Sequence, residues 1–92
     1  KFYADKGIEV IKTLSRITPV SISINEIDLN QEESSPFIMR LNGYVNTVGS
    51  SGRLILNNYL KRLSGERIIE EVVLVNQRVA NNTIIFNIDI IL

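Results

Sequence analysis

Cysteine and histidine are both absent from the 92 residues of this chain. Without cysteine there are no disulfides, no thiolate nucleophile and no sulfur ligands for a metal ion. Without histidine the chain lacks the usual general base near neutral pH and the commonest transition-metal ligand. These absences argue against hydrolytic and metal-dependent enzymes, so we expect no catalytic residue, no metal and no cofactor.

An excess of one charge is also missing, because ten Lys and Arg residues balance ten Asp and Glu residues. A neutral domain has no long-range field to attract nucleic acid or an anionic membrane. No apolar run approaches the roughly 18 residues of a membrane span, and no signal peptide is visible. The chain begins at Lys1 rather than Met, so we expect a fragment of a longer protein.

The length predicts one domain over residues 1–92. Folding a chain of this size hides only about 60 to 65% of the surface that the unfolded chain exposes. We therefore expect modest stability, to which the surface of a partner contributes.

The first third of the sequence predicts a helix and a bulged strand. Apolar residues three and four apart across residues 5–17 mark one buried helix face, and Pro19 stops the helix. Alternation over residues 20–29 predicts a strand whose phase changes near Asn25 and Glu26, which indicates a β-bulge. Because bulges are commonest on edge strands, we place this strand at a sheet edge.

An acidic, turn-rich loop over residues 30–36 precedes a second predicted strand, residues 37–45. Gly43 takes a core-facing place in this strand, where a missing side chain usually lets another backbone approach. We expect the following helix to pass there.

The second half repeats this pattern. Residues 49–52 (GSSG) predict a turn and a Ser helix cap, Gly65 ends the helix, and residues 68–79 and 83–92 alternate as strands. Residues 80–82 form a tight turn, because Asn tolerates positive φ. The apolar stripe of the second helix consists of Leu56, Tyr59, Leu60 and Leu63.

Two helix-plus-hairpin units, residues 1–45 and 50–92, give the order αββαββ. Such units normally form a four-stranded antiparallel sheet with both helices on one face. This is an α+β, ferredoxin-like arrangement that begins at a different strand, a circular permutation. We expect the second and fourth strands at the centre and the first and third at the edges.

The open sheet face is where we expect a binding site. Its single aromatic, Tyr44, argues against RNA, which sheets of this shape bind on two or three aromatic rings. Arg40 and Asp89 are expected to form a surface ion pair rather than a catalytic pair. Ile38, Tyr44, Ile85 and Ile91 make this face too apolar for one fully exposed to water, which indicates that a partner covers part of it. The predicted interface comprises the edge residues Ser21, Ser23 and Asn25 and the face residues Ile38, Arg40, Tyr44, Ile85, Asn87 and Ile91.

Three segments resemble the periplasmic domain of the PilN fimbrial-assembly family: LSRITPVSISINEIDL, FIMRLNGYV and GRLILNNYLKRLSGERIIEEVVL. That family shows a helix, a Pro, a strand with spaced aliphatics, a strand with x-L-x-G, an amphipathic helix and a V-x-L strand. The resemblance covers most of residues 8–92. The residues that carry it are Pro19, Ile27, Leu29, Leu41, Gly43, Leu60, Leu63, Val72 and Leu74.

The resemblance implies a non-catalytic scaffold domain in the inner-membrane platform of a type IV pilus or of a related type II secretion system. It implies a periplasmic location, a membrane helix before this fragment, and pairing with a PilO-like subunit or with itself. The secretion proteins GspL and GspM are related candidates. The longer acidic loop departs from the compact hairpin of the family.

Two other function classes share this architecture. A regulatory domain of the ACT type would bind a small molecule at a helix or sheet interface. An acylphosphatase-like enzyme would need an Arg-bearing phosphate loop, for which the chain offers only GSSGR at a helix start, and a turn with a cap explains that segment better.

Overall fold

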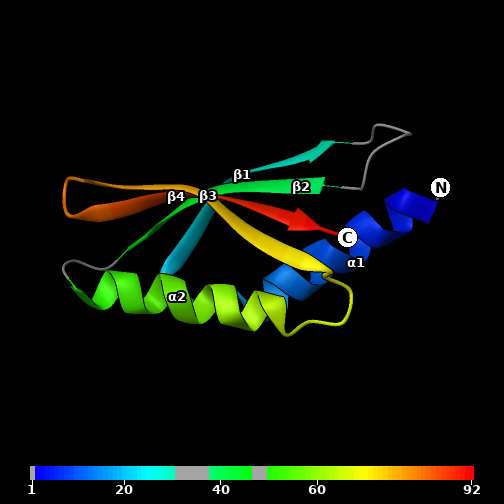
Figure 1. The fold of residues 1–92 in the computed structure, drawn as a ribbon, viewed down its shortest axis with the longest axis horizontal. Coiled ribbons are helices and arrows are strands. Elements are labelled where there is room, and N and C mark those ends of the chain that lie inside the picture. Colours follow the sequence, from blue (N-terminus) through cyan, green and yellow to red (C-terminus); the bar gives the residue numbers. More distant parts are fainter. Residues whose placement is uncertain (1, 31–37, 47–49) are drawn as a thin grey trace.

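The computed structural model describes residues 2–30, 38–46 and 50–92 (Figure 1). The elements in chain order are α1 (Phe2–Ile17), β1 (Ile22–Asn30), β2 (Ile38–Val45), α2 (Ser50–Ser64), β3 (Glu71–Ala80) and β4 (Thr83–Ile91). The predicted αββαββ order is confirmed. Most of the predicted acidic loop lies outside the described residues.

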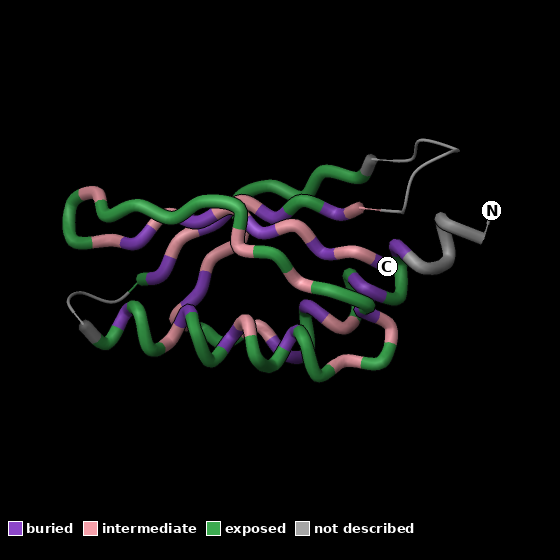
Figure 2. Tube along the Cα trace, in the orientation of Figure 1, coloured by how far each residue is buried: buried purple, intermediate pink, exposed green. Residues whose placement is uncertain are grey.

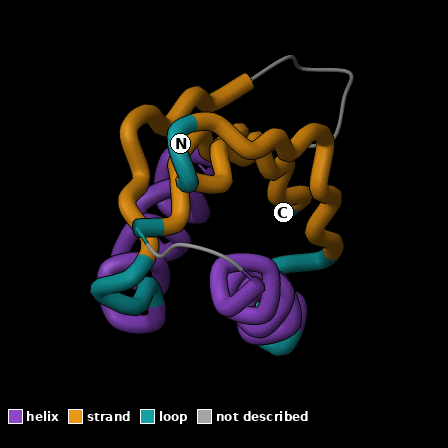
Figure 3. The backbone as a smooth tube through the Cα atoms, turned by 90° about the vertical axis from the view of Figure 1, so that its left-hand side faces the viewer, coloured by secondary structure: helices purple, strands orange, loops and turns teal. Residues whose placement is uncertain are grey.

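All three strand pairs are antiparallel, and the strand order is β1-β2-β4-β3. Both helices lie on one side of this sheet and leave its other face uncovered (Figure 3). The protein is therefore an α+β domain with a circularly permuted ferredoxin-like arrangement. As expected, β2 and β4 are central and β1 and β3 form the edges.

Helix α1 packs on the sheet through only part of the predicted stripe, because Ile8 and Ile11, which the spacing also placed in it, are exposed. Val10, Leu14 and Ile17 are buried. The helix ends where Pro19 requires it, and the Thr18 N–H donates the last helical hydrogen bond to the Leu14 carbonyl at 2.9 Å. It begins at Phe2, three residues before the predicted start.

Helix α2 starts earlier than the sequence indicated. The predicted turn and cap over residues 49–52 are wrong for Ser50–Gly52, which lie inside the helix. The end is as expected, because the Gly65 N–H donates to the carbonyls of Lys61 and Arg62 at 3.1 and 3.2 Å. Position 49 lies outside the described residues.

The core lies between the helices and the inner face of the sheet (Figure 2). Every second residue of β2 and β4 is buried, which reflects the two-residue period of a strand. One cluster of buried residues joins both halves of the chain. Its fully covered side chains are Val10, Met39, Leu41, Val45, Leu63, Phe86, Ile88 and Ile90.

Both edge strands are bulged. The register of β1 against β2 shifts between Ile24 and Glu26, which confirms the predicted bulge at Asn25. The register of β3 against β4 shifts in the same way between Leu74 and Asn76. The second bulge was not predicted. The two bulges lie 50 residues apart and show that the duplication extends to the edges of the sheet.

Gly43 permits the first bulge. A Cβ atom at this position would collide with the Ser23 carbonyl oxygen and lie 3.2 Å from the Ile24 Cα and 3.0 Å from the Phe86 ring. The close backbone is therefore that of β1, and the expectation that α2 passes there is wrong. The Ser23 carbonyl, just before the bulge, takes the space that a side chain would occupy.

The β3–β4 hairpin has the predicted tight turn. Asn81 and Asn82 adopt φ values of 52° and 64°. Two consecutive positive φ angles are the requirement of the two-residue turn that matches strand twist. Strand β3 begins three residues later than predicted, and Ile69 in the preceding bend is buried.

Leu63→Ala should lower the free energy of unfolding by ~2 to 5 kcal/mol, because a fully buried Leu leaves a cavity. Leu60 was assigned to the same stripe but is only half-buried, so Leu60→Ala is the matched control with a smaller loss. Urea denaturation of the two variants measures both values. Equal losses would show that α2 is rotated relative to this description.

Gly43→Ala should destabilise the protein by about 1 to 3 kcal/mol, the usual effect of overpacking, because the new methyl group meets the β1 backbone. Gly65→Ala is the control, since a Cβ there meets its nearest neighbour at 3.5 Å, an ordinary contact. Thermal unfolding compares them. A Gly43→Ala variant as stable as wild type would mean that the bulge moves without cost.

Candidate functional site: two free sheet edges and a polar open face

The open face is crossed by rows of residues that the strand register places side by side. Its central row contains Glu26, Asn42, Asn87 and Asn76, one from each strand. The Asn87 Nδ2 donates to the Asn42 Oδ1 at 2.6 Å, and the Asn42 Nδ2 donates to the Glu26 Oε1 at 2.9 Å. This amide row runs through both bulges.

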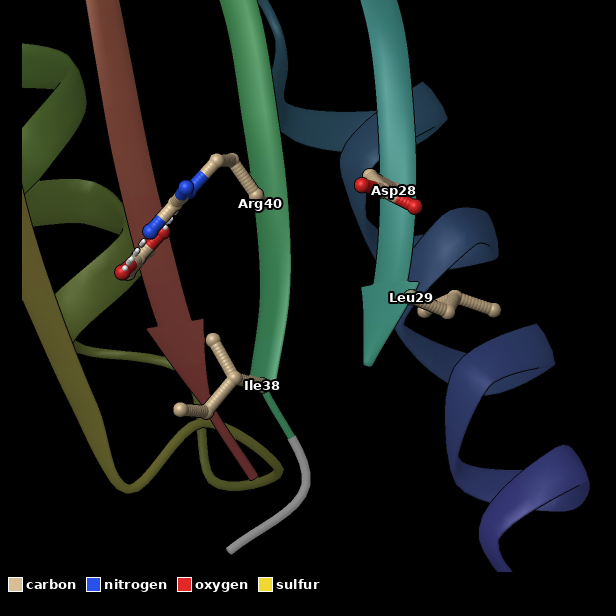
Figure 4. A pocket seen from close by; sticks show the side chains of 5 residues that line it. Asp28, Leu29, Ile38 and Arg40 are labelled. Carbon is tan, nitrogen blue, oxygen red and sulfur yellow. Dashed lines mark hydrogen bonds and ion pairs between the residues drawn. The ribbon is translucent and has the colours of Figure 1, made fainter. Parts of the chain in front are cut away.

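The neighbouring row carries charge. Arg40 donates from Nε and Nη2 to the two carboxylate oxygens of Asp89 at 2.7 and 3.0 Å (Figure 4). The hydrogen bond and charge of Asp89 raise the pKa of Arg40 above its ordinary value, and the charge of Asp28 adds to this. The predicted surface ion pair is confirmed, and its bidentate geometry fixes the guanidinium.

The apolar residues of this face are divided. Tyr44 pairs with Ile85 at one end of the central strands, and Ile38 pairs with Ile91 at the other. All four are half-buried, and the polar rows separate them. These predicted interface residues therefore form two small apolar pairs rather than one continuous patch.

Several polar groups of the face bind each other, namely Arg40 with Asp89 and Asn42 with Asn87 and Glu26. Within the described ranges no buried side-chain nitrogen or oxygen lacks a hydrogen-bond partner, and no cluster of three acidic residues could hold a metal ion. A shallow hollow of about 260 Å³ lies beside Asp28, Leu29, Ile38, Arg40 and Asp89. It offers the Arg40–Asp89 ion pair and the Asp28 carboxylate, and its lining residues include no hydroxyl, thiol or amine side chain.

The free edge of β1 follows from the hydrogen bonding of its first residues. The Asn46 N–H donates to the Ser21 carbonyl at 2.7 Å, so this carbonyl faces β2. Residues of an antiparallel strand turn their backbone groups alternately to either side. Ser23 therefore also faces β2, while Ile22 and Ile24 face outward. The predicted edge residues Ser21 and Ser23 do not supply the free backbone groups.

Beyond the bulge the alternation restarts. Glu26 is paired with Asn42, which faces β1 by the same rule, so Ile27 and Leu29 face outward. Asn25, the third predicted edge residue, is the exposed extra residue of the bulge. We define the β1 edge as the outward backbone groups of Ile22, Ile24, Ile27 and Leu29.

The β3 edge is built in the same way. The Glu70 N–H donates to the Ile91 carbonyl at 2.8 Å, so Ile91 faces β3. The two-residue turn, which closes on Ala80 and Thr83, gives the same assignment from the other end of the hairpin. We define the β3 edge as the outward backbone groups of Val72, Leu74, Gln77 and Val79.

Aliphatic side chains flank both edges. On the β1 side, Leu29 points toward α1 (Figure 4), and Ile8 and Ile11 of that helix are 52% and 43% exposed. On the β3 side, Val75 is 49% exposed and Val79 is 62% exposed.

The β3 bulge left a signal in the sequence. The core-side residues of β3 change from even positions (Val72, Leu74) to odd positions (Gln77, Val79), but apolar residues between them, Val73 and Val75, hid the change.

A second hollow lies where the end of α1 meets α2. It measures about 270 Å³ and is lined by Ile17, Pro19, Ser21, Ile55, Asn58, Tyr59 and Arg62. The Tyr59 hydroxyl lies 2.7 Å from the Thr18 Oγ1. Burial raises the pKa of Tyr59, although the bond to Thr18 opposes this, so the hydroxyl stays protonated at neutral pH.

The assignment of the β3 edge predicts a difference between two adjacent exposed residues. Arg78→Pro removes an N–H that bonds to β4, whereas Gln77→Pro removes one that faces outward. Arg78→Pro should therefore cost about 1 to 3 kcal/mol more stability. Thermal unfolding at low protein concentration, where association contributes least, measures this. The reverse order would exchange the inward and outward residues of β3.

No helix in the described part of the chain is long and apolar enough to cross a membrane. Comparison with protein-family models, with curated proteins and with solved structures gives no match. The PilN resemblance therefore stays a prediction.

Proposed function

We propose that this chain is a non-catalytic protein–protein interaction domain that pairs through a sheet edge with a domain of similar fold. The observation that carries this proposal is the pair of bulged edges, β1 and β3, which no other strand in the described part of the chain covers and which exposed aliphatic side chains flank. An edge offers unpaired N–H and C=O groups to any strand of matching register.

The arrangement favours strand addition over other modes of binding. Main-chain hydrogen bonds supply contacts along a whole edge, and the flanking aliphatic side chains supply apolar area. A specific contact needs to bury about 1,200 Å² or more in total. Edge pairing can reach this area if side chains on both sides of the sheet join the contact, as Val79 on the helix side and Val75 at the bulge would.

The open face supports a structural rather than a catalytic role. Arg40 is held by Asp89, and Asn42 is held by Asn87 and Glu26. A catalytic site normally keeps an acid, a base or a nucleophile free to meet substrate. These side chains instead link the strands and stiffen the surface that presents the edges.

The PilN resemblance gives this proposal a setting. In that setting the domain is a periplasmic scaffold of a type IV pilus or type II secretion platform. It is joined to an inner-membrane helix that precedes this fragment and is paired with a PilO-like subunit, with a second copy, or with both. Edge pairing suits such a role because it joins domains of like fold without a ligand.

A regulatory domain of the ACT type is the second candidate, and the hollow between α1 and α2 is the observation that favours it. Asn58 and Arg62 could bind a small anion or amino acid there. Its volume of about 270 Å³ lies below the roughly 300 to 1,000 Å³ of typical ligand pockets. An increase in melting temperature with a panel of free amino acids would support this candidate.

The test of the proposed function is association itself. Light scattering over a wide concentration range, alone and with a PilO-like domain, should show a complex. Leu29→Pro removes an outward N–H of the β1 edge and Gln77→Pro one of the β3 edge, so at least one should weaken the complex. Ile85→Lys probes the open face instead.

A folded domain that stays monomeric at high concentration and binds no partner domain would contradict the proposed function. Loss of binding only in Ile85→Lys would move the interface from the edges to the open face.

A further inference from the structure

We propose, on the basis of the interaction function above, that the β3 edge pairs with the β3 edge of a second copy of this chain about a two-fold axis. The two four-stranded sheets then form one continuous antiparallel sheet. The bulge, the charges and the apolar residues of β3 each lead to this partner.

The spacing of outward residues selects the partner strand. Val72 and Leu74 are separated by two positions, Leu74 and Gln77 by three, and Gln77 and Val79 by two. A strand without a bulge turns every second residue outward, so it matches only one half of this edge. The spacing two, three, two reads the same in both directions, so an antiparallel second copy matches both halves.

This pairing fixes the register. Val72 lies opposite the partner's Val79, and Leu74 lies opposite the partner's Gln77, with both contacts repeated by symmetry. The axis passes between Val75 and Asn76, where the two bulges face each other. The exposed Val79 side chain gains an apolar neighbour on the helix side of the sheet.

The charges of β3 agree with this register. Glu71 and Arg78 are both exposed and share the open face. In the paired strands Glu71 is the diagonal neighbour of the partner's Arg78, at a separation that long side chains span. The contact occurs twice, and no like charges lie directly opposite one another.

The other pairings are electrostatically or geometrically less suitable. The β1 edge has the same spacing, but its open-face charges are Glu26 and Asp28, and a two-fold axis at its bulge would bring Glu26 beside the partner's Glu26. Pairing of β1 with β3 of another copy matches in spacing, but the β3 edge left on one copy and the β1 edge left on the other can form the same contact again, so it builds open chains. Only β3 with β3 gives a closed, charge-matched dimer.

Reversal of the charges tests the register. Glu71→Arg and Arg78→Glu should each weaken the dimer by about threefold to thirtyfold, since each turns two attractions into repulsions. The double variant Glu71→Arg, Arg78→Glu should recover most of the wild-type affinity. Lys12→Glu, an exposed reversal on α1, is the control and should leave the dimer unchanged. Sedimentation equilibrium gives the dissociation constants.

Cysteine pairing provides an independent test on a chain without native Cys. The register puts Val73 directly opposite the partner's Arg78, at a Cα separation suited to a disulfide. A mixture of Val73→Cys and Arg78→Cys proteins should cross-link rapidly on oxidation. Val73→Cys alone should not, because its symmetry mate lies five residues away along the strand.

The outcomes separate this inference from the proposed function. Recovery in the double variant together with cross-linking of the mixture supports β3 pairing. A complex that forms but ignores all three charge variants overturns the β3 assignment and leaves the interaction function standing. A third outcome would indicate β1–β3 chains instead. In it, Arg78→Glu weakens the association, the double variant does not recover the affinity, and the mass of the wild-type complex grows beyond that of a dimer. A monomer at all concentrations overturns the dimer.

Discussion

The pairing of β2 with β4 is the contact on which the rest of the structure depends. Each half of the chain is a helix and a hairpin, and a hairpin alone is at best marginally stable in water. The central pair sets Met39 beside Ile90 and Leu41 beside Ile88, and all four are completely buried. The same register sets the Asn42–Asn87 and Arg40–Asp89 bonds on the other face. Two half-domains thereby share one core, and the strands left outside are β1 and β3.

The bulges follow from this central pair. Asn42 and Asn87, which face each other across it, are also the residues opposite the two bulges, with Glu26 and Asn76 as their edge-strand partners. The extra residue of a bulge shifts the alternation of an edge strand by one position, so that aliphatic residues before and after it can both face the core. It also breaks the regular outward spacing, which blocks pairing with ordinary strands. The same feature therefore protects the edge and restricts its partners.

The sequence predicted the elements, the strand order and the first bulge because each leaves a local pattern. The phase change around Asn25 was visible because polar residues surround it. The bulge at Val75 was hidden, because Val73 interrupts the alternation before it and the core-side residue that follows it, Gln77, is polar. The neighbour of Gly43 was assigned to the wrong element, since spacing shows only that a backbone comes close and not which one. The direction of the Ser23 backbone depends on hydrogen bonds across the sheet, and no local pattern reports them.

In a β3-paired dimer, the two edges of each copy would bind different partners. Both β1 strands would lie at the outer ends of the joined sheet, each with Glu26 and Asp28 on the open face and Ile27 and Leu29 partly exposed beside α1. An acidic edge repels its own copy and attracts a strand that carries basic residues. Self-pairing through β3 and pairing with a different domain through β1 would then be compatible. A scaffold that must hold two kinds of neighbour needs such a division, which a single edge cannot provide.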